Sequence, residues 1–132
     1  MQKFKFVSYI VLWVAAIVGG IVFAQTVQID VDQDLMHAID ETNKDINSNI
    51  SLKDSKAAIA HAKELQDYFQ QVETVFKEHG NVDDGVDLAV KARQAAEELA
   101  KSASANDFDA AQAHAKDLSS TCKSCHDVYK SS

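Results

Sequence analysis

The feature that most constrains this chain is the absence of proline from all 132 residues. Proline breaks helix interiors and glycine weakens them, and two of the four glycines, Gly19 and Gly20, lie in an N-terminal apolar stretch. Most of the remainder is alanine, leucine, lysine, glutamate, aspartate and glutamine, which are mostly good helix formers. A chain of this length has room for one domain, and 46% apolar residues can supply its core. The sequence therefore predicts a single all-helical domain.

The first 24 residues have the pattern of an export signal and are set apart from the domain, residues 25–132. Lys3 and Lys5 precede an uncharged apolar run from Phe6 to Phe23, and small or aliphatic residues lead up to a cleavage position after Ala24. The run of 18 residues is also close to the ~20 that span a bilayer. Cleavage and retention as an inner-membrane anchor both remain open, and both predict a periplasmic domain.

Four later stretches have the apolar spacing of amphipathic helices. The first covers about residues 32–47. The second begins near Ser51, whose spacing to Asp54 resembles a capping box, and ends before Gly80. Connections of roughly four to seven residues force neighbouring helices to run antiparallel. The pattern predicts an antiparallel up-down-up-down four-helix bundle, an all-α fold.

The third helix is predicted to be capped by Asp83 or Asp84, and the fourth by Ser104 or Asn106 after a break over residues 102–106. Inward-facing residues recur every three or four positions along the helices. In chain order these are Met36, Ile39, Ile46, Ile50, Ala62, Leu65, Phe69, Val72, Phe76, Val86, Ala89, Ala92, Ala96, Leu99, Phe108, Ala111, Ala115, Leu118, Cys122, Cys125 and Tyr129.

Residues 122–126 read Cys-Lys-Ser-Cys-His, the C-x-x-C-H arrangement that attaches haem c covalently. Helix positions i and i+3 share a face, so Cys122 and Cys125 can both reach the vinyl groups on one porphyrin edge. His126 can then ligate the iron. A thioredoxin-like pair would need a strand–helix context, and half a zinc site would need more ligands. A plain disulfide in an oxidising compartment is a further alternative. The adjacent histidine, the export signal and the absence of other cysteines favour one covalent haem c.

Bundle topology predicts Met36 as the second iron ligand. The start of the first helix and the end of the fourth share one end of the bundle. At ~1.5 Å rise per residue, Met36 and His126 lie at nearly the same height. Met36 is the only methionine after residue 24 and faces inward, although core packing also explains it. Neighbouring His37 is a weaker rival as ligand.

Two more residues are predicted at the same end. Phe76 is the last inward-facing residue of the second helix and is a candidate wall of the haem pocket. Arg93, the only arginine, is a candidate partner for a haem propionate, with an ordinary surface position as the alternative.

With these residues placed, residues 32–130 resemble the class II c-type cytochromes, the cytochrome c-prime group, which are four-helix bundles with C-x-x-C-H near the end of the last helix. The resemblance implies thioethers at Cys122 and Cys125 and a proximal ligand at His126. Low-spin members fill the sixth iron position with a methionine, matched here by Met36, whereas high-spin members leave it open and bind small gases. Family members often carry an arginine where this chain has Asp32, and the link between helices two and three is short for the group.

The expected function is periplasmic one-electron transfer, with the iron cycling between ferrous and ferric. No substrate loop or acid–base pair is evident, so no enzymatic activity is expected. One rival is a gas-binding haem protein in which Met36 only packs near an open iron face. The other is a haem-free bundle with a Cys122–Cys125 disulfide or a metal site.

The net charge of the chain limits the classes of partner that it is expected to bind. After residue 24 the chain has 11 basic against 20 acidic residues, a net charge of −9 without a cofactor. This surface argues against nucleic acid and anionic membranes as partners. An acidic surface could instead bind basic redox partner proteins, or it could serve only to keep the protein soluble. Related bundles often form homodimers, and membrane association is expected only if the N-terminal segment is retained.

Overall fold

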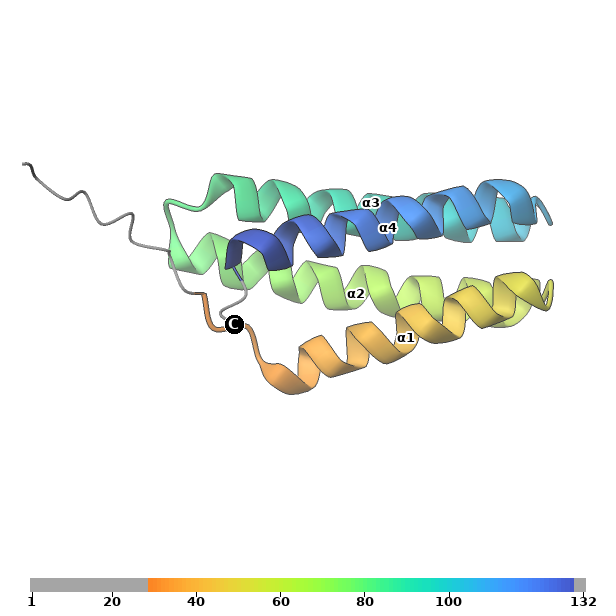
Figure 1. Ribbon diagram of the computed structural model, residues 1–132, viewed down its shortest axis with the longest axis horizontal. Coiled ribbons are helices and arrows are strands. Elements are labelled where there is room, and N and C mark those ends of the chain that lie inside the picture. The colour runs from red at the N-terminus through yellow and green to blue at the C-terminus, as the bar shows by residue number, and fades with distance from the viewer. Residues whose placement is uncertain (1–28, 130–132) are drawn as a thin grey trace, which may run out of the picture.

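The computed structural model describes residues 29–129, so the predicted export signal lies outside the described residues. Four helices make up almost all of this part: α1 (Gln33–Ser51), α2 (Ser55–His79), α3 (Asp83–Ser104) and α4 (Phe108–Tyr129). They run alternately up and down, and each packs beside the next in the chain (Figure 1). The predicted antiparallel four-helix bundle is confirmed. Within residues 29–129, no helix combines the length and apolar character needed to cross a membrane.

The links between helices are shorter than predicted and span residues 52–54, 80–82 and 105–107. Helices α1 and α3 extend further than the sequence pattern indicated. Each link contains a residue in the left-handed region, namely Lys53, Asn81 and Asn106, with φ between 56° and 57°. A left-handed residue directs the chain away from the helix axis, so the chain reverses over few residues.

Two predicted caps are wrong by a few residues. Asp54 rather than Ser51 caps α2, because its carboxylate accepts a hydrogen bond from the Ala57 amide at 3.0 Å. Ser51 instead ends α1. Asp107 caps α4 in place of Ser104 or Asn106 by accepting from the Ala110 amide at 3.0 Å. In both links the carboxylate immediately before the helix reaches the free amides of its first turn.

Helix α3 begins without a side-chain cap, since the residue before it is Val82. Asp83 and Asp84, predicted as alternative caps, lie inside the first turn instead. Negative charges there complement the positive end of the helix dipole. This position leaves the Asp84 carboxylate free to meet another helix.

The core follows the predicted inward stripes with one shift. The largest fully buried side chains are Ile46, Leu65, Phe76, Leu99 and Leu118. On α3 the buried stripe starts at Gly85 rather than Val86, which is only half-buried, and continues through alanines. Small residues let helix backbones approach closely, and the contact between α2 and α3 is the most extensive in the bundle.

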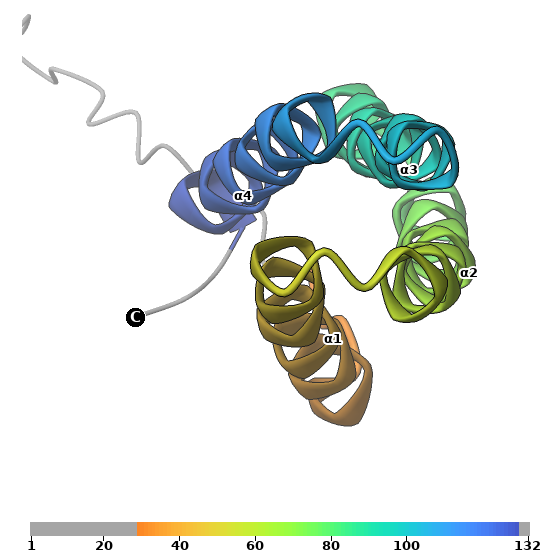
Figure 2. The same ribbon diagram turned by 90° about the vertical axis from the view of Figure 1, so that its right-hand side faces the viewer.

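Helix α1 is the least tightly held of the four. Seen end-on in Figure 2, α2, α3 and α4 form a curved row, while α1 runs outward from it. Figure 1 shows the same divergence, which is greatest at the N-terminal end of α1, near the C-terminal end of α4. Among the four pairs of neighbouring helices, α1 and α4 have the least extensive contact.

Candidate functional site

The C-x-x-C-H residues occupy the last two turns of α4. Cys122 and Cys125 are free cysteines, and both are half-buried against the hydrophobic core. They continue the inward stripe from Leu118 toward Tyr129, as the helical spacing predicted. His126 is exposed. One helix face therefore presents two sulfur atoms one turn apart, with an imidazole at the edge of that face.

Burial along the α1–α4 interface changes from one end to the other. Far from the motif, Ile46 on α1 and Ala111 on α4 are fully buried. At the motif end, the inward residues Met36, Cys122 and Cys125 are only half-buried. The interface is thus packed at one end and loose at the other, and the loose end carries the soft sulfur and nitrogen donors that haem iron and vinyl groups use. The residues present fit a haem held between α1 and α4.

Burial raises the pKa of both cysteine thiols and so disfavours their thiolate forms. Burial is the main reason that the pKa of Cys122 rises to about 11, and nearby Cys125 and Asp40 add to the shift. Burial also raises the pKa of Cys125, with a further contribution from Asp84. A protonated thiol is a poor nucleophile. The raised pKa values therefore argue against a role of these cysteines in thiol–disulfide exchange.

Met36 lies in the first turns of α1, at the same end of the bundle as His126. The electrostatics link this part of α1 to the motif through Asp40, one turn after Met36. The pKa of Asp40 is lowered chiefly by its hydrogen bond from Lys44 at 2.6 Å, with a smaller contribution from the charge of His126. Met36 and His126 thus lie at the same end of the bundle, on α1 and α4.

His37, the weaker rival as ligand, points to a partner on its own helix. It is exposed, and its Nε2 lies 3.3 Å from Oε1 of Glu41. Asp32, which stands where the resembling family often has arginine, caps α1 by accepting from the amides of Asp34 and Leu35. This capping role explains an acidic residue at that position.

Phe76 lies at the motif end, as predicted, and is 1% exposed. Its ring packs edge-to-face on Tyr129, with centroids 4.9 Å apart. It also packs so closely on Gly85 that a β-carbon there would overlap the ring. The Tyr129 hydroxyl donates a hydrogen bond to Asp84. Through these contacts α2, α3 and α4 pack tightly against one another at the end of the bundle that carries the cysteines.

Arg93 has a protein partner. Its Nε lies 3.4 Å from Oε2 of Glu73 on α2, although the geometry is not that of a hydrogen bond and the buried Nε has no hydrogen-bond partner. Lys77 shares the same carboxylate group. The structure brings Arg93 to the α2–α3 surface rather than onto the cysteine-bearing face of α4, and its role toward a haem propionate stays a prediction.

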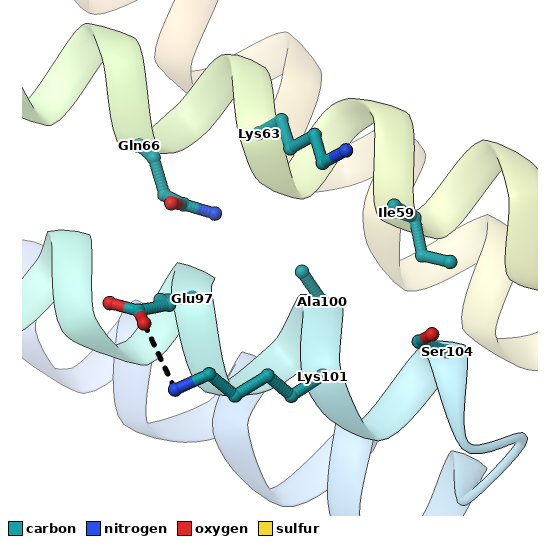
Figure 3. A pocket seen from close by; sticks show the side chains of 7 residues that line it. All are labelled: Ile59, Lys63, Gln66, Glu97, Ala100, Lys101 and Ser104. Atoms are coloured by element: carbon teal, nitrogen blue, oxygen red, sulfur yellow. Dashed lines mark ion pairs between the residues drawn. The ribbon is translucent and has the colours of Figure 1, made fainter.

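A surface groove of about 450 Å³ lies between α2 and α3. Figure 3 shows its lining side chains, which include Ile59, Lys63 and Ala100, and the Lys101–Glu97 ion pair of 2.9 Å. These residues belong to the start of α2 and the end of α3, at the opposite end of the bundle from the motif. Within residues 29–129, no three His, Cys, Asp or Glu side chains gather in a metal-binding arrangement.

Sequence reasoning missed Asp84 and Gly85 as residues that shape this end. A signal for Gly85 was available, because a glycine inside a helix costs about 1 kcal/mol relative to alanine and often marks a close approach. The contact of Asp84 with Tyr129 has no sequence signal, since it joins residues 45 apart.

Comparison with known proteins supports one family. Residues 81–130, less than half of the chain, match the family model described as Cytochrome C'. That stretch holds α3, α4 and the complete C-x-x-C-H motif. No curated protein and no solved structure matches the chain. Cytochrome c' proteins are four-helix bundles with one covalently attached haem c, and they carry electrons or bind gases rather than acting as classical enzymes. The match supports a class II c-type cytochrome with one haem c.

Proposed function

We propose that this chain is a class II c-type cytochrome that acts as a periplasmic one-electron carrier, with its haem iron ligated by His126 and Met36. Cys122 and Cys125 would form the two thioethers, and Phe76 would belong to the pocket wall. When bound, the haem supplies the reversible change between ferrous and ferric iron. The observation that carries the proposal is the loose α1–α4 interface, where half-buried Met36 lies in the first turns of α1, at the same end of the bundle as the motif of α4.

Two ligands held by separate helices suit electron transfer. A thioether on α1 and an imidazole on α4 would keep the iron six-coordinate in both oxidation states, and methionine with histidine raises the reduction potential. The packed α2–α3–α4 side limits movement of the histidine-bearing helix. Little rearrangement would then accompany each electron. The periplasmic location agrees with the usual location of cytochrome c' proteins.

Replacing Met36 with alanine tests the distal ligand. The wild-type holoprotein, made in a host that matures c-type cytochromes, is expected to show low-spin spectra in both oxidation states. Met36→Ala removes the thioether, so its spectra should become high-spin, and carbon monoxide should bind its ferrous iron. His37→Ala, a change of the exposed neighbour, is the matched control and should leave the spectra low-spin.

Two results would contradict this assignment. Unchanged low-spin spectra in Met36→Ala would exclude Met36 as ligand, and a loss of the low-spin bands in His37→Ala would transfer the role to His37. High-spin bands in the wild-type protein that shift with carbon monoxide would favour the gas-binding alternative instead.

We also propose that the acidic surface selects basic redox partners. Exposed Asp30, Glu78, Asp83, Asp87 and Asp127 lie at the motif end of the helices. The negative potential of such a surface attracts cationic reactants and repels anionic ones, and salt screens this effect. At low salt, the cation hexaammineruthenium should therefore exchange electrons with the protein faster than the anion ferricyanide. After correction for the difference in driving force, its rate constant should be about tenfold higher.

This preference should diminish as salt is added. Asp83→Asn/Asp87→Asn should reduce the salt dependence, whereas Asp109→Asn, at the opposite end, should change it less. Equal salt dependence for the cationic and anionic reagents would exclude electrostatic partner selection and leave solubility as the role of the charge.

A further inference from the structure

We propose that Tyr129 and Asp84 form a positioning pair that fixes the last turn of α4 and thereby sets the orientation of the His126 ring. The inference rests on the proposed function, in which His126 ligates the haem iron. It assigns a role to two residues that make no contact with the iron. Tyr129 acts through the helix backbone, and Asp84 acts through Tyr129.

The need for such a pair comes from the position of His126. It lies about one turn before Tyr129, the last residue of α4 that the structure describes. The last four carbonyls of a helix lack intrahelical partners, and terminal turns fray unless tertiary contacts hold them. His126 is exposed, so its own side chain does not supply such contacts. The orientation of its ring depends on the turn that bears it.

Tyr129 supplies the missing contacts on two sides. Its ring lies edge-to-face on Phe76 of α2, and its hydroxyl donates to Asp84 in the first turn of α3. Cys125 and Tyr129 are four residues apart and share one helix face, so the attachment point and the anchor lie on the same stripe. The turn containing His126 is thus held to two other helices.

The hydroxyl remains a donor throughout the physiological range. Burial, followed by the neighbouring Asp84 carboxylate, raises the pKa of Tyr129 to about 12. Hydrogen bonds to charged acceptors are stronger than those between neutral groups. Asp84 also lies at a helix N-terminus, where a negative charge is favoured. The Tyr129 hydroxyl can therefore keep donating to Asp84 at neutral pH.

Tyr129→Phe tests the inference because it removes the hydroxyl and keeps the ring on Phe76. In the holoprotein, amide hydrogen exchange of residues 124–128 should become roughly tenfold to a hundredfold faster, the factor that corresponds to losing such a hydrogen bond. The ferric electron paramagnetic resonance g-values should also shift, since they report the geometry of the axial ligands. Tyr68→Phe, the same change on half-buried Tyr68 of α2, is the matched control.

Asp84→Ala should reproduce both effects. The double variant Tyr129→Phe/Asp84→Ala should exchange no faster than either single variant, because one interaction has been removed in all three. Asp84→Asn, which keeps an acceptor without the charge, should be intermediate.

The outcomes separate this inference from the proposed function. Faster exchange with unchanged g-values would overturn the positioning role, leaving a purely structural contact. Unchanged exchange and g-values in Tyr129→Phe would overturn the inference altogether. A wild-type protein without covalent haem would instead overturn the proposed function, and the positioning role with it.

Discussion

Cys122→Ser/Cys125→Ser is expected to abolish covalent haem attachment completely. A serine hydroxyl does not form the thioether that a cysteine sulfur forms with a haem vinyl group. The substitution keeps nearly the same side-chain volume at two half-buried positions, so the helices should persist. The intact mass of the purified variant should equal that of the polypeptide alone, whereas the wild-type mass should include one haem. A pyridine haemochrome assay of the denatured proteins should agree.

Controls for this result come from the motif itself. Ser124→Ala changes the exposed residue between Lys123 and Cys125, whose hydroxyl bonds only to the Ser120 carbonyl of its own helix. It should retain full haem content. Single variants should retain one thioether and a lower yield of holoprotein. A covalent haem in the double variant, or none in the wild-type protein made with the proper assembly machinery, would refute the haem assignment.

Gly85→Ala is expected to produce the largest loss of stability from a single added methyl group. A β-carbon at position 85 would overlap the ring of Phe76, which is 1% exposed and also packs on Tyr129. Overpacking costs about 1–3 kcal/mol, only partly offset by the better helix propensity of alanine, about 0.5–1 kcal/mol. For a domain of this size, Tm falls by roughly 4–8 °C per kcal/mol.

Thermal unfolding of the holoprotein, followed by circular dichroism, measures this effect. Phe76→Leu in the Gly85→Ala background should restore part of the loss, because the smaller side chain leaves room for the new methyl group. An added methyl on an exposed α3 residue, such as Ser104→Thr, would not show the overlap and is the matched control. If Gly85→Ala unfolds at the wild-type temperature, the close packing of α2 on α3 at this end is wrong.

Most of the fold and part of the site could be predicted from the local sequence. Helix number, direction and inward stripes were predictable, because apolar spacing of three and four residues is written along the chain. Helix ends were less predictable, because each link offers several polar residues that could act as the N-cap. The residue that caps the helix is the one whose side chain reaches the free amides of the first turn, and in two links this is an aspartate, Asp54 or Asp107. The pairing of Arg93 with Glu73 was not predictable for a similar reason, because two helices contribute it.

The sequence by itself determined that this chain forms long helices and places Cys122, Cys125 and His126 near the end of the last one. Both properties are local, since they follow from residue spacing along one chain segment. Only the tertiary structure decided that α1 diverges from α4 beside the motif, that Gly85 meets Phe76, and that Tyr129 reaches Asp84. Such contacts depend on the rotation and tilt of whole helices, which many small packing energies set together and no single residue specifies.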